Sequence, residues 1–117
     1  MCKVNVFQIL MNKEFHFTET LDSTNKEAQR KMAEMADERT HVFYTHFQSQ
    51  GRGQGDHTWE SERGVNVLMS ILLKNRQIPF LLQFGISHAT ALALVDFVLE
   101  ELPGVEIHIK WPNDILI

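Results

Sequence analysis

Cysteine is almost absent from the 117 residues, with Cys2 as the single example. One thiol excludes an internal disulfide framework and any cysteine-based zinc site, so we expect a cytoplasmic protein. A basic excess is also missing, because 11 Lys and Arg face 15 Asp and Glu, for a net charge of −4. Nucleic-acid-binding proteins usually carry an excess of Lys and Arg, so no nucleic-acid partner is expected.

The sequence also lacks a long uncharged apolar run. Its most apolar segment, residues 81–102, contains Asp96, Glu100 and Glu101, which favours a core-facing helix over a membrane span. Residues 1–10 show neither a basic start nor a sustained apolar stretch, so we predict no signal peptide and no membrane partner. With 3 prolines, 6 glycines and 44% hydrophobic residues, the composition is that of one globular domain.

Alternation of apolar and polar residues predicts strands over residues 15–21 and 107–111. β-branched and aromatic residues predict a strand over 42–47, and apolar runs predict two more, over 65–73 and 115–117. Residues 48–63 between two of these strands are rich in glycine and polar side chains and are expected to form a loop. Because no helix separates those two strands, we expect an α/β protein of the α+β type. Its sheet would be mixed and largely antiparallel, with helices packed on it.

Two helices are predicted. The first begins near Thr24, which has the capping-box spacing to Glu27, and ends near Asp37, with Met32 on its core face. The second covers residues 81–102 and is stopped by Pro103 and Gly104.

A glycine-rich stretch in the predicted loop reads Gly51-Arg52-Gly53-Gln54-Gly55. Glycines let the backbone approach a ligand and present N–H groups to an anion, and an arginine between them can bind a carboxylate or phosphate. The spacing is neither that of a P-loop nor that of a dinucleotide fingerprint. Alone, the stretch is equally compatible with a flexible hairpin loop.

Two further stretches carry polar chemistry. Lys110-Trp111-Pro112-Asn113-Asp114 combines a cation, an aromatic plate, a rigid turn, an amide and a carboxylate at the end of a strand. It could hold a nucleotide, with the lysine on phosphate and the aspartate on a metal ion or hydroxyl, or it could be a plain turn. Asp22-Ser23-Thr24-Asn25 stands at a predicted helix start and could be a helix cap alone.

Taken in order, these motifs resemble the catalytic domain of biotin protein ligases, also called biotin–[acetyl-CoA carboxylase] ligases. The resemblance runs from about Phe15 to Ile117 and includes Trp59 downstream of the glycine-rich stretch. It implies a fold like that of class II synthetases and biotin ligases. It also implies ATP-dependent formation of biotinyl-5′-AMP, followed by transfer of biotin to a lysine of a biotin carrier protein of the acetyl-CoA carboxylase type. Biotin and ATP with Mg²⁺ would be substrates, with no tightly bound cofactor.

The resemblance also implies a role for each motif residue. Biotin binding would involve Ser23, Thr24, Asn25, Gln48, Gly51, Arg52, Gly53 and Gln54. Nucleotide binding would involve Trp59, Lys110, Asn113 and Asp114. Arg52 and Lys110 would be catalytic, because two anions must be brought together when the biotin carboxylate attacks the α-phosphate.

The protein alone is expected to build no metal site, and Mg²⁺ would arrive with ATP, with Asp114 as its candidate ligand. The six histidines show no paired ligand spacing, at positions His16, His41, His46, His57, His88 and His108.

The chain also departs from the family pattern. Gln54 stands where the family usually carries a second arginine, and His57 replaces another basic residue. In the family, a further lysine, the remaining strands and a C-terminal barrel domain come after the position of Ile117. In bifunctional members, a winged-helix DNA-binding domain comes before the position of Phe15. We therefore expect residues 1–117 to be the N-terminal part of a catalytic domain, without a DNA-binding or barrel domain and with little or no ligase activity alone.

Two alternatives remain open at this point. A lipoate–protein ligase would share the fold and the acyl-adenylating chemistry. A non-catalytic module would bind biotin or a protein partner without turnover.

The missing charge at Gln54 generates a first prediction. In the longest natural polypeptide that contains these residues, Gln54→Arg should reduce the release of free biotinyl-5′-AMP, because a second fixed cation would hold the anionic intermediate. Chromatography of labelled adenylate, free and protein-bound, measures the release. Equal release from the wild type and the variant would contradict the prediction.

Overall fold

The computed structural model describes residues 12–37, 39–53, 55–73, 79, 82–111 and 113–117. The chain divides into two compact units, Met1–Arg76 and Gln77–Ile117. Within the described residues, no helix combines the length and the apolar character needed to cross a membrane.

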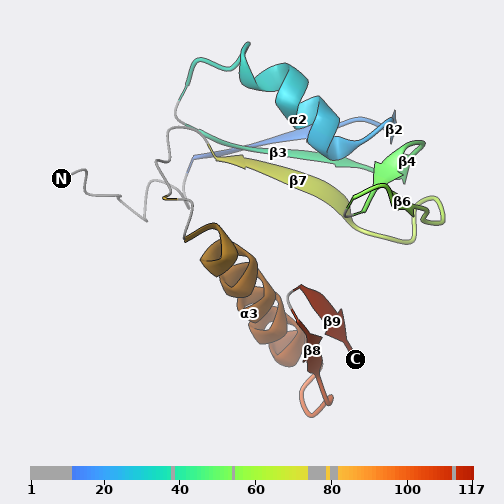
Figure 1. Ribbon diagram of the computed structural model, residues 1–117, viewed down its shortest axis with the longest axis vertical. Helices are drawn as coiled ribbons and strands as arrows, with labels where there is room; N and C mark the ends of the chain where they lie inside the picture. Colours follow the sequence, from blue (N-terminus) through green and yellow to red (C-terminus); the bar gives the residue numbers. More distant parts are fainter. Residues whose placement is uncertain (1–11, 38, 54, 74–78, 80–81, 112) are drawn as a thin grey trace. The chain divides into compact units, whose positions relative to one another are not determined.

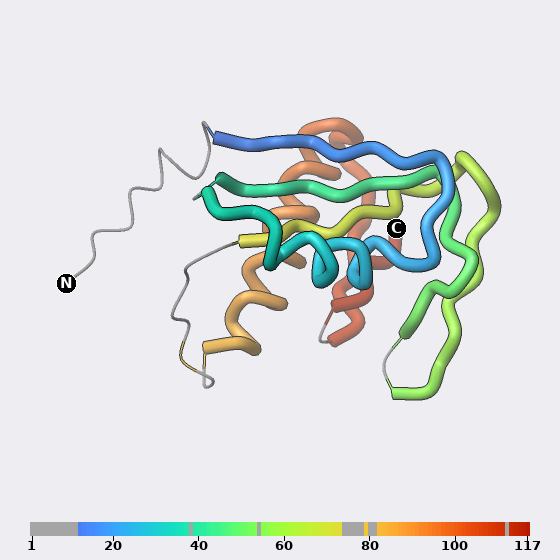
Figure 2. Tube along the Cα trace, turned by 90° about the horizontal axis from the view of Figure 1, so that it is seen from above, coloured from blue at the N-terminus to red at the C-terminus, as the bar shows by residue number. Residues whose placement is uncertain are grey.

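The first unit is built on a three-stranded sheet in the order β1-β3-β7. Strand β1 (Lys13–Phe17) runs parallel to β3 (Thr40–Thr45), and β7 (Leu68–Leu73) runs antiparallel to β3. Figure 2 shows the three strands side by side, in blue, green and yellow. The predicted mixed sheet is confirmed, and three of the five described strand pairings are antiparallel.

Helix α2 (Thr24–Met32) connects β1 to β3 and covers one face of the sheet, where it packs on β3 and β7 (Figure 1). Ala28 of the helix and Phe43 of β3 are buried between these two layers. Side chains of the opposite face, including Phe15 and Ile71, are more than half exposed. The core of this unit therefore lies between α2 and the sheet.

Helix α2 ends five residues before the predicted boundary, so that prediction is wrong. The N–H groups of Glu34 and Met35 both donate to the Lys31 carbonyl oxygen, at 3.0 and 3.1 Å, and close a turn. The chain has to turn back here, because β3 starts at Thr40 beside the beginning of β1. Met32, predicted to be in the core, is 52% exposed on this last turn.

The predicted capping box is also wrong. Ser23 is the N-cap residue and Thr24 is the first helical residue. Glu27 accepts hydrogen bonds from the Arg30 guanidinium, one turn further along the helix. The motif residues at the helix start are therefore fixed by other contacts.

Residues 48–63, predicted to be a loop, contain regular pairing. Strand β2 (Thr20–Leu21) runs parallel to β4 (Phe47–Gln48), and β5 (Gly51–Arg52) pairs antiparallel with β6 (Thr58–Trp59). Strand β7 consequently starts at Leu68, three residues after the predicted position.

The second unit consists of helix α3 (Gln83–Glu101) and the hairpin of β8 (His108–Lys110) and β9 (Asp114–Leu116). Gly104 has a φ of 86°, which suits glycine and confirms the predicted stop after the helix. Ala91 is the buried residue of α3, and most of its other side chains are exposed, since within this unit only a two-stranded hairpin covers the helix.

Candidate functional site

The Asp22–Asn25 motif lies between β2 and α2 and is anchored through Asp22. The Asp22 carboxylate accepts two hydrogen bonds from the Arg30 guanidinium, at 3.0 and 2.8 Å, and one from the Ser23 backbone N–H at 2.8 Å. The Arg30 guanidinium, and after it the Ser23 N–H, hold the pKa of the Asp22 carboxyl well below its usual range. Asp22 therefore stays ionised near neutral pH and keeps the helix start in place.

Gln48 joins the Asp22–Asn25 motif to the segment that leads into the glycine-rich stretch. The Thr24 backbone N–H donates to Gln48 Oε1 at 2.7 Å, next to the parallel pairing of Leu21 with Gln48. The backbone continues the link, because the Ser49 and Gln50 N–H groups donate to the Leu21 and Asp22 carbonyl oxygens at 2.9 and 2.8 Å. These contacts hold Leu21, Asp22 and Thr24 beside residues 48–50.

A chain of hydroxyl groups extends this contact to β7. Ser70 Oγ donates to Asn25 Oδ1 at 2.5 Å, because a carbonyl oxygen only accepts. Thr24 Oγ1 lies 2.8 Å from Ser70 Oγ and 3.1 Å from Gln48 Oε1. Its one hydrogen can go to either acceptor, because Gln48 Oε1 has a second lone pair besides the one used by the Thr24 backbone. Thr24 is buried, whereas Asn25 reaches the surface.

Ser70 is a site residue that the sequence reasoning missed. It is the one polar residue of β7, and it lies opposite the buried Phe43, on the face that α2 covers. The signal available in the sequence was a single hydroxyl residue within an otherwise apolar predicted strand.

The glycine-rich stretch takes a close-packed conformation that requires Gly51. A Cβ atom at this position would collide with the backbone carbonyl oxygen of Trp59, the residue that pairs with Gly51 across β5 and β6. The Gly53 N–H donates to the His57 carbonyl oxygen at 2.8 Å and continues the pairing. The Arg52 side chain is exposed, and Gln54 lies outside the described residues.

Two cavities flank this stretch. The larger, of about 310 Å³, is lined by backbone and side chains from residues 47–51 and 58–61, including Gln48, Gly51 and Trp59. The smaller, of about 190 Å³, is lined by Arg52, Gly55, Asp56, His57 and Thr58. Trp59 is 62% exposed and stands at the wall of the larger cavity. The larger cavity is at the lower end of the size range of small-molecule pockets, and the smaller one falls below that range.

The last motif lies in the hairpin of the second unit. Lys110 pairs with Asp114 across the two strands, and its Nζ lies 3.7 Å from Asp114 Oδ2. Both side chains are exposed, as is Asn113, whose amide donates to Asp114 Oδ1 at 3.3 Å. The Trp111 indole N–H donates to His88 Nε2 of α3 at 2.8 Å, which fastens the hairpin to the helix.

These three motifs are the ones on which the resemblance to biotin protein ligases is based, and the structure describes all of them except Gln54 and Pro112. The family model described as "Biotin/lipoate A/B protein ligase family" matches residues 17–117. The chain belongs to this family.

Several of its relatives are named as ligases, among them biotin ligases. The bifunctional ligase/repressor BirA of Bacillus subtilis is 35% identical over 108 residues, which are 92% of this chain and 32% of that protein. The biotin–[acetyl-CoA-carboxylase] ligase of Mycobacterium tuberculosis is 30% identical over 96 residues, 80% of this chain and 36% of that protein. The chain thus spans about a third of the length of these relatives.

Solved structures agree with this assignment. The biotin protein ligase of Leishmania major in complex with biotinyl-5-AMP aligns with a TM-score of 0.71 and 28% identity, over 88% of this chain and 47% of that chain. The expected biotin ligase fold is therefore confirmed, while the roles of the individual motif residues stay predictions.

The packing of Gly51 generates a second prediction. Gly51→Ala should open the β5–β6 pairing and lower the free energy of unfolding by about 1–3 kcal/mol, because the added methyl group meets fixed backbone. Urea unfolding and amide hydrogen exchange at residues 52–59 measure both effects.

Gly85→Ala is the matched control, since a Cβ on Gly85 in α3 meets nothing within 4 Å. It should stabilise the protein by about 0.5–1 kcal/mol through helix propensity. Unchanged exchange in Gly51→Ala would contradict the proposed constraint on the hairpin.

Proposed function

We propose that this chain supplies biotin- and nucleotide-binding residues of a biotin protein ligase. The reaction would begin with attack of the biotin carboxylate on the α-phosphorus of ATP, with release of pyrophosphate and formation of biotinyl-5′-AMP. A lysine amine of a biotin carrier protein would then attack the acyl carbon and release AMP. The observation that supports this most is the convergence of Thr24, Gln48 and Gly51 beside the larger cavity, in a chain whose relatives are biotin ligases.

Biotin carries a polar ureido ring at one end and a carboxylate at the other. Gln48 Oε1 accepts from the Thr24 backbone, so the Gln48 NH₂ group is oriented to donate to a ligand. Gln48 also lines the larger cavity, and Thr24 and Asn25 belong to the same hydrogen-bonded chain. We assign the ureido end to these three residues together with Ser23.

The carboxylate end would lie at the Gly-Arg-Gly hairpin. Gly51 allows the backbone to approach closely, and the exposed Arg52 guanidinium could reach both a carboxylate and the α-phosphate. A fixed cation at this point offsets the repulsion between the two anions in the transition state. Trp59 would cover the adenylate and keep water from the acyl–phosphate bond, in line with its exposed position at the cavity wall.

The hairpin of the second unit would serve the nucleotide. Lys110 and Asp114 form an exposed pair at 3.7 Å, and exposed ion pairs are weak. Phosphate binding to the ammonium group and Mg²⁺ binding to the carboxylate would therefore separate this pair at little cost. Asn113, next to Asp114, would add an amide to the same side of the nucleotide.

Lipoate is the second candidate substrate, because the matching family includes lipoate ligases. Its dithiolane ring is apolar and offers no acceptor for the amide NH₂ groups of Asn25 and Gln48, whose carbonyl oxygens already accept within the protein. Burying such groups unpaired costs binding energy, so these residues favour biotin.

A direct test uses the longest natural polypeptide that contains these residues, with ATP labelled at the α-phosphate. We expect label in an acyl-adenylate with biotin and none with lipoate. Arg52→Gln should reduce the rate of adenylate formation roughly 100- to 1,000-fold, the usual effect of removing a preorganised charge stabiliser.

Lys31→Gln is the matched control, because it also removes one positive charge, from the last turn of α2. It should leave the rate unchanged. Labelling with lipoate alone would support the second candidate, and biotin binding without any labelling would indicate a non-catalytic module. An Arg52→Gln enzyme as fast as the wild type would contradict the role of Arg52.

A further inference from the structure

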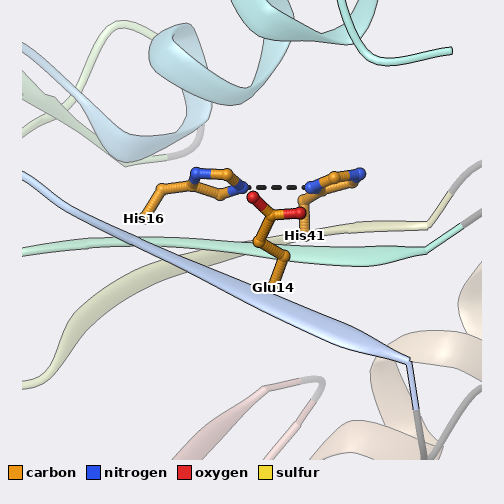
Figure 3. Close-up of side chains that lie close together, drawn as sticks. All are labelled: Glu14, His16 and His41. Carbon is orange, nitrogen blue, oxygen red and sulfur yellow. Dashed lines mark hydrogen bonds between the residues drawn. The ribbon is translucent and has the colours of Figure 1, made fainter. Parts of the chain in front are cut away.

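Two histidines and a glutamate come together on the helix-covered face of the sheet, apart from the motifs described above. Glu14 and His16 are two residues apart on β1, so both point to the same face. The parallel register places His41 of β3 directly opposite Glu14. One ligand atom from each of the three side chains lies within 4.8 Å of the other two (Figure 3).

The two imidazole rings are already close to a ligating geometry. His16 Nε2 lies 3.0 Å from His41 Nδ1. Two nitrogens bound to one tetrahedral Zn²⁺ at 2.0–2.1 Å would stand about 3.3 Å apart, so they need to separate by only a few tenths of an ångström. Stacking of the His16 ring on Phe43, with centroids 4.8 Å apart, keeps this ring in place.

His41 donates a ring N–H to a carboxylate, as metal-ligating histidines usually do. Its Nε2 lies 2.9 Å from Asp37 Oδ1, and a carboxylate accepts, so Nε2 carries the hydrogen. The lone pair is then on Nδ1, which faces His16 and Glu14. His41 is 1% exposed, so its ring is fixed by burial as well as by this hydrogen bond.

Glu14 supplies the third donor. Its Oε2 is shielded from solvent and accepts no hydrogen bond from the described residues. Arg39 Nη1 forms an ion pair with this oxygen at 2.6 Å, and the same guanidinium donates to Asp37 Oδ2. A carboxylate has two oxygens and about four lone-pair sites, so the pair with Arg39 leaves Glu14 room to bind a metal ion as well.

We propose that Glu14, His16 and His41 bind one divalent transition-metal ion, with Zn²⁺ as the best match to two imidazoles and a carboxylate. Asp37 would position His41, and the fourth ligand would be water. Binding replaces the hydrogen bond between the two histidines, as the His16 hydrogen moves from Nε2 to Nδ1 and frees Nε2 for the metal. The ion would tie β1 to β3 and would stabilise the sheet. The sequence suggested no such site, because these residues become neighbours only through strand pairing.

The test uses the 117-residue chain without a polyhistidine tag and with Cys2→Ser, so that neither adds ligands. After chelator treatment, Zn²⁺ alone is titrated by calorimetry, and Co²⁺ is added to record its visible absorption. We expect one ion per chain, a tetrahedral Co²⁺ spectrum and a higher unfolding midpoint with metal. An absence of binding would overturn the proposal.

Variants separate this site from adventitious binding. His16→Asn and Glu14→Gln, at half-buried positions, should lower the Zn²⁺ affinity by more than roughly 100-fold, and Asp37→Asn by about 10- to 100-fold, as an outer contact does. The control is His46→Asn, which removes an exposed histidine that also pairs with a carboxylate, Glu19 at 2.9 Å. Wild-type affinity in His16→Asn, or an equal loss in His46→Asn, would contradict the proposal. His41→Asn carries no weight in this test, because loss of a buried ring can unfold the sheet.

Discussion

The hydrogen bond from the Thr24 backbone to the Gln48 side chain is the contact on which the candidate ligand site depends. It joins a helix start to the end of a strand, and the parallel pairing of β2 with β4 supports it from the backbone side. Without it, the Thr24 hydroxyl contact at 3.1 Å would be left to orient the Gln48 amide beside the larger cavity. Because the donor is a backbone N–H group, the contact survives changes of the Thr24 side chain and depends on the acceptor alone.

Strand β3 connects the two sites that we propose. His41 at its beginning belongs to the metal-binding cluster, and Gln48 follows shortly after its end. Phe43 lies between them, buried at 2% exposure, with His16 stacked against it and Ser70 opposite it in β7. A metal ion that links β1 to β3 would therefore also stabilise the sheet that carries the ligand-binding hydrogen-bond network.

The sequence predicted the elements better than their contacts. The motifs at residues 22–25, 51–53 and 110–114 were identified because their residue types carry recognisable chemistry. Strands β1, β3, β7, β8 and β9 and helix α3 followed from residue patterns and stop signals, whereas β5 and β6 lie in a stretch predicted to be a loop. The early end of α2 was missed, because the return of the chain to β3 is a tertiary requirement rather than a local preference. Ser70 and the pairing of His16 with His41 were missed for a similar reason, since strand register is not readable from spacing along one chain.

The most direct test of the central contact is a biotin titration of the 117-residue chain by calorimetry, comparing the wild type with Gln48→Met. Methionine keeps the length of the side chain and removes both the acceptor and the donor. Gln29→Met is the control, because Gln29 is exposed on helix α2 and lines neither cavity. The account predicts at least a ~10-fold weaker affinity for Gln48→Met, equivalent to about 1.4 kcal/mol, and no change for Gln29→Met. Biotin binding by Gln48→Met as tight as that of the wild type would contradict it.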